Sequence, residues 1–172
     1  MLTNHDAKIV WIIGLPNAGK TVVAQALHEA LRRLGKPALL LDGDDIRKVL
    51  HMTDSHYDRK SRIENALRIG RLAQVAQSQG LWVIVAANTF FHEVQRCHRK
   101  QLPGYFEVYL QADEAVRRAR DDEKKLYQRF DEGAVRDVLG LDIEPEEPEH
   151  PDVVLVNTED TELQSLLDCL LR

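Results

Sequence analysis

The sequence predicts an α/β protein in which helices cover both faces of a five-stranded parallel sheet, a three-layer α/β/α arrangement. Three observations lead to this prediction: five apolar runs of strand length, helical stretches that alternate with them, and a glycine-containing loop directly after the first run. Runs that are apolar at nearly every position are typical of strands buried on both faces of a parallel sheet. Strands that alternate with helices predict crossover connections, which place ligands beyond the carboxyl ends of the strands.

Each predicted strand is short and rich in β-branched, leucine or aromatic residues. The strands cover residues 9–13, 38–41, 82–87, 105–110 and 153–156. The segment 144–151, just before the last strand, contains three prolines and four glutamates and predicts an exposed loop.

The predicted helices carry apolar residues at helical spacing. In the first helix Val23, Leu27 and Leu31 share one face, and Gly35 followed by Pro37 predicts its end. The helices cover residues 20–34, 46–52, 59–79, 91–101, 114–122 and 161–171.

Length and composition limit the classes of protein that fit. The 172 residues suit a single domain spanning 1–172, and 44% apolar with 30% charged residues is a globular composition. The longest apolar run, 81–87, is too short to cross a bilayer, and the first residues lack a secretory pattern, so we expect a cytoplasmic protein without membrane contact. A net charge of −5 with local arginine clusters favours a small anionic ligand over nucleic acid. Cys97 and Cys169 are expected to be ordinary thiols.

The clearest motif is a phosphate-binding loop. Gly14, Leu15, Pro16, Asn17, Ala18, Gly19, Lys20 and Thr21 match the pattern GxxxxGK[ST] between a predicted strand and a predicted helix. Backbone N–H groups of such a loop, with the helix N-terminus, surround the phosphates of a nucleotide. Lys20 is expected to reach the β- and γ-phosphates, and the Thr21 hydroxyl is expected to bind Mg²⁺.

The loop alone does not say what is done with the nucleotide. Regulatory GTPases usually carry Asn-Lys-x-Asp after a late strand, and the corresponding residues 157–160 read Asn-Thr-Glu-Asp, without the lysine. A small-molecule kinase and a nucleotide-binding module without chemistry both stay open.

Three carboxylates follow the second predicted strand. Asp42, Asp44 and Asp45 lie where a parallel sheet would bring them close to the phosphate loop, and such a cluster is costly unless a cation or a substrate hydroxyl uses it. We expect Asp44 to orient the attacking hydroxyl and to help hold Mg²⁺. The other interpretation is a helix cap, with Asp44 or, more readily, Asp45 capping a helix that starts near Ile46.

At this point the sequence resembles the adenylylsulfate kinase family, which phosphorylates the ribose 3′-hydroxyl of adenylylsulfate with MgATP in sulfate assimilation. The resemblance runs in order from about Val10 to Pro148. Its residues are the loop 14–21, Asp42-Gly43-Asp44, Arg47, Tyr57, Arg62 to Asn65, Arg68 to Gly70, Lys124 to Tyr127, Gly140 to Asp142 and Glu146 to Pro148.

The resemblance implies a P-loop kinase fold with a small helical lid at about residues 119–139. It implies ATP and Mg²⁺ as cofactors, a nucleotide as the small-molecule substrate and a homodimer. The implied roles are Lys20 and Asp44 in catalysis, Thr21 and Asp44 at the metal, and Asp42, Asp44, Arg47, Tyr57, Arg62, Asn65, Lys125 and Val138 at the acceptor.

Three departures from the family pattern concern the acceptor. Val138 stands where the family has a lid phenylalanine that stacks on adenine, and the expected cost is lost stacking on that side. Asn88, Thr89 and Phe90 stand where the family has Ile-Ser-Pro, and His92 stands where an arginine follows. The family's Arg-Asp before the lid fits Arg120-Asp121 if one residue is inserted, which we prefer to Asp121-Asp122.

These departures leave three hypotheses. The first is an adenylylsulfate kinase in which Phe90 or another aromatic completes the clamp, and the sequence alone favours it. The second is a kinase for another nucleotide-linked acceptor, such as cytidine diphosphoramidate, whose smaller base needs less clamp. The third is a binding module without catalysis.

Overall fold

The computed structural model describes residues 8–50, 57–121, 125–158 and 160–171. Its five strands form one sheet with the order β2-β3-β1-β4-β5, and all four neighbouring pairs are parallel. The strands are β1 Ile9–Ile13, β2 Ala38–Asp42, β3 Trp82–Ala86, β4 Tyr105–Gln111 and β5 Val153–Val156. The predicted fold class is confirmed, and each strand lies within two residues of its predicted bounds.

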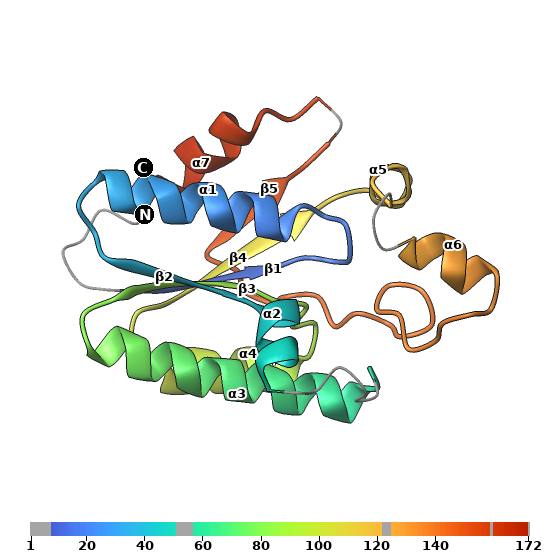
Figure 1. Ribbon diagram of the computed structural model, residues 1–172, viewed down its shortest axis with the longest axis horizontal. Helices are drawn as coiled ribbons and strands as arrows, with labels where there is room; N and C mark the ends of the chain where they lie inside the picture. The colour runs from blue at the N-terminus through green and yellow to red at the C-terminus, as the bar shows by residue number, and fades with distance from the viewer. Residues whose placement is uncertain (1–7, 51–56, 122–124, 159, 172) are drawn as a thin grey trace.

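Helices cover both faces of the sheet (Figure 1). Helices α1 and α7 lie on one face, and α2, α3 and α4 lie on the other. The helices are α1 Lys20–Arg33, α2 Gly43–Val49, α3 Arg59–Ser78, α4 His92–Gln101, α5 Glu114–Ala119, α6 Leu126–Asp131 and α7 Leu163–Leu171. No helix among the described residues is both long enough and apolar enough to cross a membrane.

Two helices differ from the sequence prediction. Helix α2 starts at Gly43 rather than near Ile46, because the Asp42 side chain accepts the backbone N–H of Asp44 in the first turn. The predicted helix 114–122 ends at Ala119, and the short helix α6 lies within the predicted lid segment 119–139. Helix α6 has only six residues, too few for a helical repeat of apolar residues to be recognised in the sequence.

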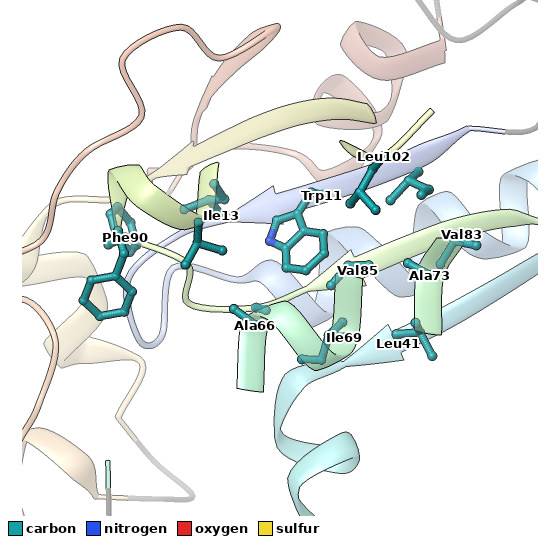
Figure 2. Packing of buried hydrophobic residues seen from close by; sticks show 14 of the residues in the cluster. Trp11, Ile13, Leu41, Ala66, Ile69, Ala73, Val83, Val85, Phe90 and Leu102 are labelled. Carbon is teal, nitrogen blue, oxygen red and sulfur yellow. The ribbon is translucent and has the colours of Figure 1, made fainter. Parts of the chain in front are cut away.

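The central strand β1 divides the core in two. All five of its side chains are fully buried: Val10 and Ile12 pack with α1 and α7, and Trp11 and Ile13 pack with α3 and α4. Figure 2 shows the second cluster, in which Trp11 and Ile13 lie close to the α3 residues Ala66 and Ile69. Each such side chain contributes about 1.5–3 kcal/mol when it leaves water. The loop that follows β1 therefore starts from a rigid base.

Candidate functional site

The phosphate loop leaves β1 at the carboxyl edge of the sheet, and α5 and α6 extend from the same edge (Figure 1). Gly19 has φ of 95°, and a Cβ atom there would lie 2.6 Å from the Asn157 amide nitrogen. Gly14 has no room either, since its Cβ would lie 2.8 Å from the carbonyl oxygen of Leu110. Both glycines are required by close packing around the loop, which ends at the N-terminus of α1.

Lys20 and Thr21 begin α1 at the mouth of this loop. The Lys20 amine donates to the Leu15 carbonyl oxygen at 2.9 Å, so it bends back over the loop. The Thr21 hydroxyl donates to a carboxylate oxygen of Asp42 at 2.8 Å. Thr21 and Asp42 thus bring two hard oxygen atoms together beside the phosphate loop, which is the type of ligand that Mg²⁺ prefers.

Asp42 has two roles, and the sequence analysis had assigned one of them, the cap of the following helix, to Asp44 or Asp45. One carboxylate oxygen meets Thr21, and the other accepts the Asp44 backbone N–H at 2.9 Å, which makes Asp42 the N-cap of α2. The prediction that Asp44 or Asp45 caps this helix was wrong. Asp44 lies exposed in the first turn of α2, and Asp45 is 2.8 Å from the amine of Lys48. The helix starts earlier because Asp42, still extended at φ of −88°, already supplies a capping carboxylate.

A hollow of about 260 Å³ opens on the other side of the loop. Asn157, directly after β5, donates to the Ala18 carbonyl oxygen at 2.8 Å. Arg120 donates to the Asn157 side-chain oxygen at 3.3 Å and to the Thr158 carbonyl oxygen at 2.9 Å. Gly19, Val22 and Val23 complete part of the wall, and this apolar and cationic lining suits the base of a nucleotide whose phosphates lie on the loop. The sequence analysis missed this role of Asn157, and the usable signal was an amide side chain directly after the last predicted strand, where ligands of a parallel sheet bind.

Asp121 connects the predicted lid segment to the phosphate loop. Its carboxylate accepts the Asn17 amide at 2.9 Å and the backbone N–H groups of Leu126 and Tyr127 at 2.8 and 2.6 Å. Burial alone would raise the pKa of this carboxyl, but these hydrogen bonds hold it below its ordinary value. Arg120 faces the nucleotide hollow and Asp121 caps α6, an arrangement that favours the predicted Arg120-Asp121 alignment.

Arg47, Tyr57 and Arg62 form a cluster on the other side of the carboxyl edge. The guanidinium carbons lie 4.7 Å (Arg47) and 5.3 Å (Arg62) from the centre of the Tyr57 ring. Burial and then the nearby positive charge of Arg47 lower the pKa of Arg62. An anion bound between the two guanidinium groups would relieve this repulsion, and arginine matches phosphate oxygens well.

Asn65 lies one helical turn beyond Arg62 on the same side of α3. Its side chain is buried, and its oxygen has no hydrogen-bond partner among the described residues. Buried amide oxygens are normally paired, so this atom is a candidate for contact with a ligand. Four residues predicted from the resemblance thus lie on this side of the edge. Two are cations, Arg47 and Arg62; Tyr57 supplies a partly exposed ring, and Asn65 supplies an acceptor oxygen without a partner among the described residues.

The remaining predicted acceptor residues lie in the lid segment. Val138 is only 4% exposed, in a turn whose Asp137 carbonyl oxygen accepts a hydrogen bond from Arg62 at 2.6 Å. Lys125 is exposed and has φ of 45° at the start of α6. Phe90 is fully buried and meets Tyr109 edge-on, with the ring centres 5.8 Å apart, so it presents no face to a base.

His92 lies at the start of α4, where the resemblance has an arginine. Its ring nitrogen pairs with the Glu147 carbonyl oxygen at 2.8 Å, and its backbone N–H donates to Glu146 at 2.7 Å. His92 is thus held by the proline-rich loop 144–151. The residues of this loop are half-buried or exposed, in keeping with its predicted exposure.

The chain is similar to several known proteins along most of its length. The sequence model of the family described as "Adenylylsulphate kinase" matches residues 6–156. A cytidine diphosphoramidate kinase from Campylobacter jejuni is 36% identical over 98% of this chain and 96% of its own length. An adenylyl-sulfate kinase from Vibrio cholerae is 35% identical over 98% of this chain and 79% of its own length. The structure of the Mycobacterium tuberculosis APS kinase in complex with AMPPNP and APS is 28% identical, has a TM-score of 0.88, and covers 98% of this chain and 97% of its own.

Proposed function

Because the chain belongs to the adenylylsulphate kinase family and is therefore a phosphotransferase, we propose that it moves the γ-phosphate of MgATP to a ribose hydroxyl of a nucleotide. One observation carries this proposal. The phosphate loop with its Thr21–Asp42 pair lies on the same sheet edge as the cationic cluster of Arg47 and Arg62. A phosphate-donor site and a cationic site for an anionic acceptor on one edge are what transfer between two nucleotides requires.

The donor side would hold ATP as follows. The triphosphate lies on the loop 14–21, and the base lies in the hollow beside Arg120 and Asn157. The Thr21 and Asp42 oxygens fit Mg²⁺, which supplies positive charge for the phosphate oxygens when it is bound. Lys20 leaves its contact with the Leu15 carbonyl oxygen and donates to the transferring phosphate.

The acceptor side would hold the second nucleotide against α2 and α3. Arg47 and Arg62 bind its anionic bridge, and the exposed part of the Tyr57 ring stacks on its base. Asp44, in the first turn of α2, orients the attacking hydroxyl and accepts its proton. In-line attack on the γ-phosphorus then needs little beyond positioning and charge stabilisation.

Of the two acceptors considered, cytidine diphosphoramidate is favoured. Val138 has no aromatic ring and Phe90 is fully buried, so neither offers the second aromatic face that a clamp on adenine would use. A smaller pyrimidine needs less stacking. The match to the Campylobacter jejuni kinase over nearly the full length of both chains supports the same choice.

Adenylylsulfate is the second candidate. The ordered motifs around Arg62 and Asn65 support it, as does the likeness to adenylyl-sulfate kinases over 87–99% of this chain. Both acceptors carry an anionic bridge that Arg47 and Arg62 would bind.

The test is ADP release from MgATP with cytidine diphosphoramidate, with adenylylsulfate and without acceptor. We expect the largest kcat/KM with the cytidine compound. A preference for adenylylsulfate would reverse the order of the two candidates. ATP binding without turnover on either compound would refute the proposed acceptors and support the non-catalytic module.

A further inference from the structure

Asn88 follows β3 at the carboxyl edge of the sheet, between the two halves of the candidate site. In the sheet, Ala86 pairs with Ile12 of β1 on one side and with Asp42 of β2 on the other. Two residues farther along, Asn88 reaches the level at which the phosphate loop and α2 begin. A Cβ atom at Gly43 would lie 3.4 Å from the Cβ atom of Ala87, which shows how closely α2 approaches this segment.

The side-chain oxygen of Asn88 is buried and has no hydrogen-bond partner among the described residues. Within the described part of the chain few side-chain atoms share this state, and one of them is the oxygen of Asn65, one helical turn from Arg62. A buried amide oxygen without a donor lowers stability, so a protein that retains one generally pairs it with a ligand or water.

The backbone around Asn88 is fixed on both sides. The Ala87 N–H donates to the Ile12 carbonyl oxygen at 3.2 Å. The Thr89 hydroxyl accepts the Trp11 indole N–H at 2.9 Å, and the Thr89 carbonyl oxygen accepts the Gln95 amide at 2.9 Å. The unpaired oxygen thus belongs to a residue between two anchored neighbours, so the backbone that carries it is held in place before a ligand arrives.

We infer that Asn88 is a specificity-determining residue whose amide oxygen accepts an N–H donor of the acceptor nucleotide. This inference rests on the proposed kinase function and deepens it. The position is distinctive, since the adenylylsulfate kinase pattern has an isoleucine there, which has no acceptor atom.

The chemistry of the two candidate acceptors differs at this point. A sulfate group presents only acceptor oxygens, and these would face the Asn88 oxygen without a shared proton. The terminal amide of a phosphoramidate donates N–H, and this group separates the two acceptors. The exocyclic amine of cytosine also donates N–H, but adenine carries such an amine too, so its recognition would separate cytidine from uridine compounds and not from adenylylsulfate. A site that offers an acceptor to such a donor discriminates strongly against analogues that lack it.

The experiment compares the wild-type protein with Asn88→Leu, which keeps the size of the side chain and removes its oxygen. The acceptors are cytidine diphosphoramidate, cytidine diphosphate and uridine diphosphate. Cytidine diphosphoramidate and cytidine diphosphate differ in the terminal amide, and cytidine diphosphate and uridine diphosphate differ in the exocyclic amine of the base. Gln79→Leu, at an exposed amide beyond the far end of α3, is the matched control.

We expect Asn88→Leu to lower kcat/KM about tenfold for the compounds that carry the recognised N–H group, the effect of one neutral hydrogen bond. The KM for ATP should stay unchanged. A loss confined to the diphosphoramidate would identify the terminal amide, and a loss shared by both cytidine compounds would identify the base amine.

A uniform change for all three acceptors, or no change, would overturn the role of Asn88 while leaving the kinase function intact. Failure of the wild-type protein to phosphorylate any of them, with adenylylsulfate also inactive, would overturn both. Thermal unfolding provides a second readout: removal of an unpaired buried oxygen should leave Tm unchanged or raise it, whereas a purely structural amide would lower Tm when replaced.

Discussion

Asp42 offers a test that separates fold from chemistry, because its two carboxylate oxygens do different things. One caps α2 through the Asp44 N–H, and the other accepts the Thr21 hydroxyl at the proposed Mg²⁺ site. Asp42→Ala removes both functions. Asp42→Asn keeps a capping oxygen, since asparagine caps helices about as well as aspartate, but removes the negative charge.

The expected magnitudes follow from these contacts. Loss of an N-cap costs about 0.5–2 kcal/mol, and about 1 kcal/mol shifts Tm by roughly 2–4 °C in a protein of this size. Asp42→Ala should therefore lower Tm by several degrees. Asp42→Asn should stay within about 1 kcal/mol of the wild type, because it loses only the charge near the helix N-terminus.

Activity should not separate the two variants in the way that stability does. Both variants should lose about ten- to hundredfold in kcat/KM and need more Mg²⁺ for half-maximal turnover, because each lacks the charged oxygen beside Thr21. Asp45→Asn is the control, since its carboxylate meets the exposed Lys48 amine in the same helix. Thermal scans and Mg²⁺ titrations of ADP release measure both effects. Wild-type turnover and Mg²⁺ dependence in Asp42→Asn would refute the assignment of this carboxylate to the metal.

Four further predictions follow from the same geometry. Lys20→Ala should cut turnover at least about a hundredfold with unchanged Tm, and near-normal ADP release would exclude the phosphate-loop role. Gly19→Ala should lower the free energy of unfolding by about 1–2 kcal/mol, because φ is 95° and the new methyl group meets the Asn157 amide at 2.6 Å; denaturant titration measures this. Val138→Phe should lower the free energy of unfolding by about 1–3 kcal/mol, because the larger side chain must fit at a position that is 4% exposed. It should not lower the KM for adenylylsulfate, and a lower KM would show that adenine lies there. Burial lowers the pKa of His98 from 6.5 to about 4, so as the pH falls the imidazole takes up its proton in the unfolded chain before it does so in the folded protein. The free energy of unfolding should therefore fall by on the order of 3 kcal/mol as the pH drops from about 6.5 to 4. Urea unfolding of the wild type and His98→Gln across this range should show a steeper pH dependence in the wild type, and equal slopes would contradict the buried neutral ring.

Most of the fold and the phosphate-donor site could be predicted from patterns of residues that are close in the sequence. The apolar runs around Trp11 and Val85 predicted strands buried on both faces, because a parallel sheet is covered by helices on each side. The loop from Gly14 to Thr21 is a local motif, and its chemistry depends on backbone geometry that glycine and the following helix impose. These features could be predicted because short-range spacing encodes them.

Contacts between distant segments decided the rest. The sequence placed the cap of α2 on Asp44 or Asp45 and had no means of finding that Asp42 reaches Thr21, 21 residues away, while it caps the helix. Asn157 meets Ala18 over 139 positions, and Asn17 meets Asp121 over 104. Such pairs become visible only when the parallel crossovers bring the strand ends to one edge.

Burial likewise depended on the tertiary structure. Phe90 was considered as a partner for a base because it is aromatic, and Val138 stood at a predicted acceptor position. Packing buries Phe90 completely and leaves Val138 only 4% exposed. Asn88 gained importance from the tertiary structure. In the sequence it is a departure from the family pattern, and in the fold its side-chain oxygen is a buried acceptor without a donor among the described residues. The order of residues thus determined the sheet, its helices and the phosphate loop, because these depend on local periodicity. The three-dimensional packing decided which side chains face the acceptor, because exposure is a property of all the segments that meet at one edge.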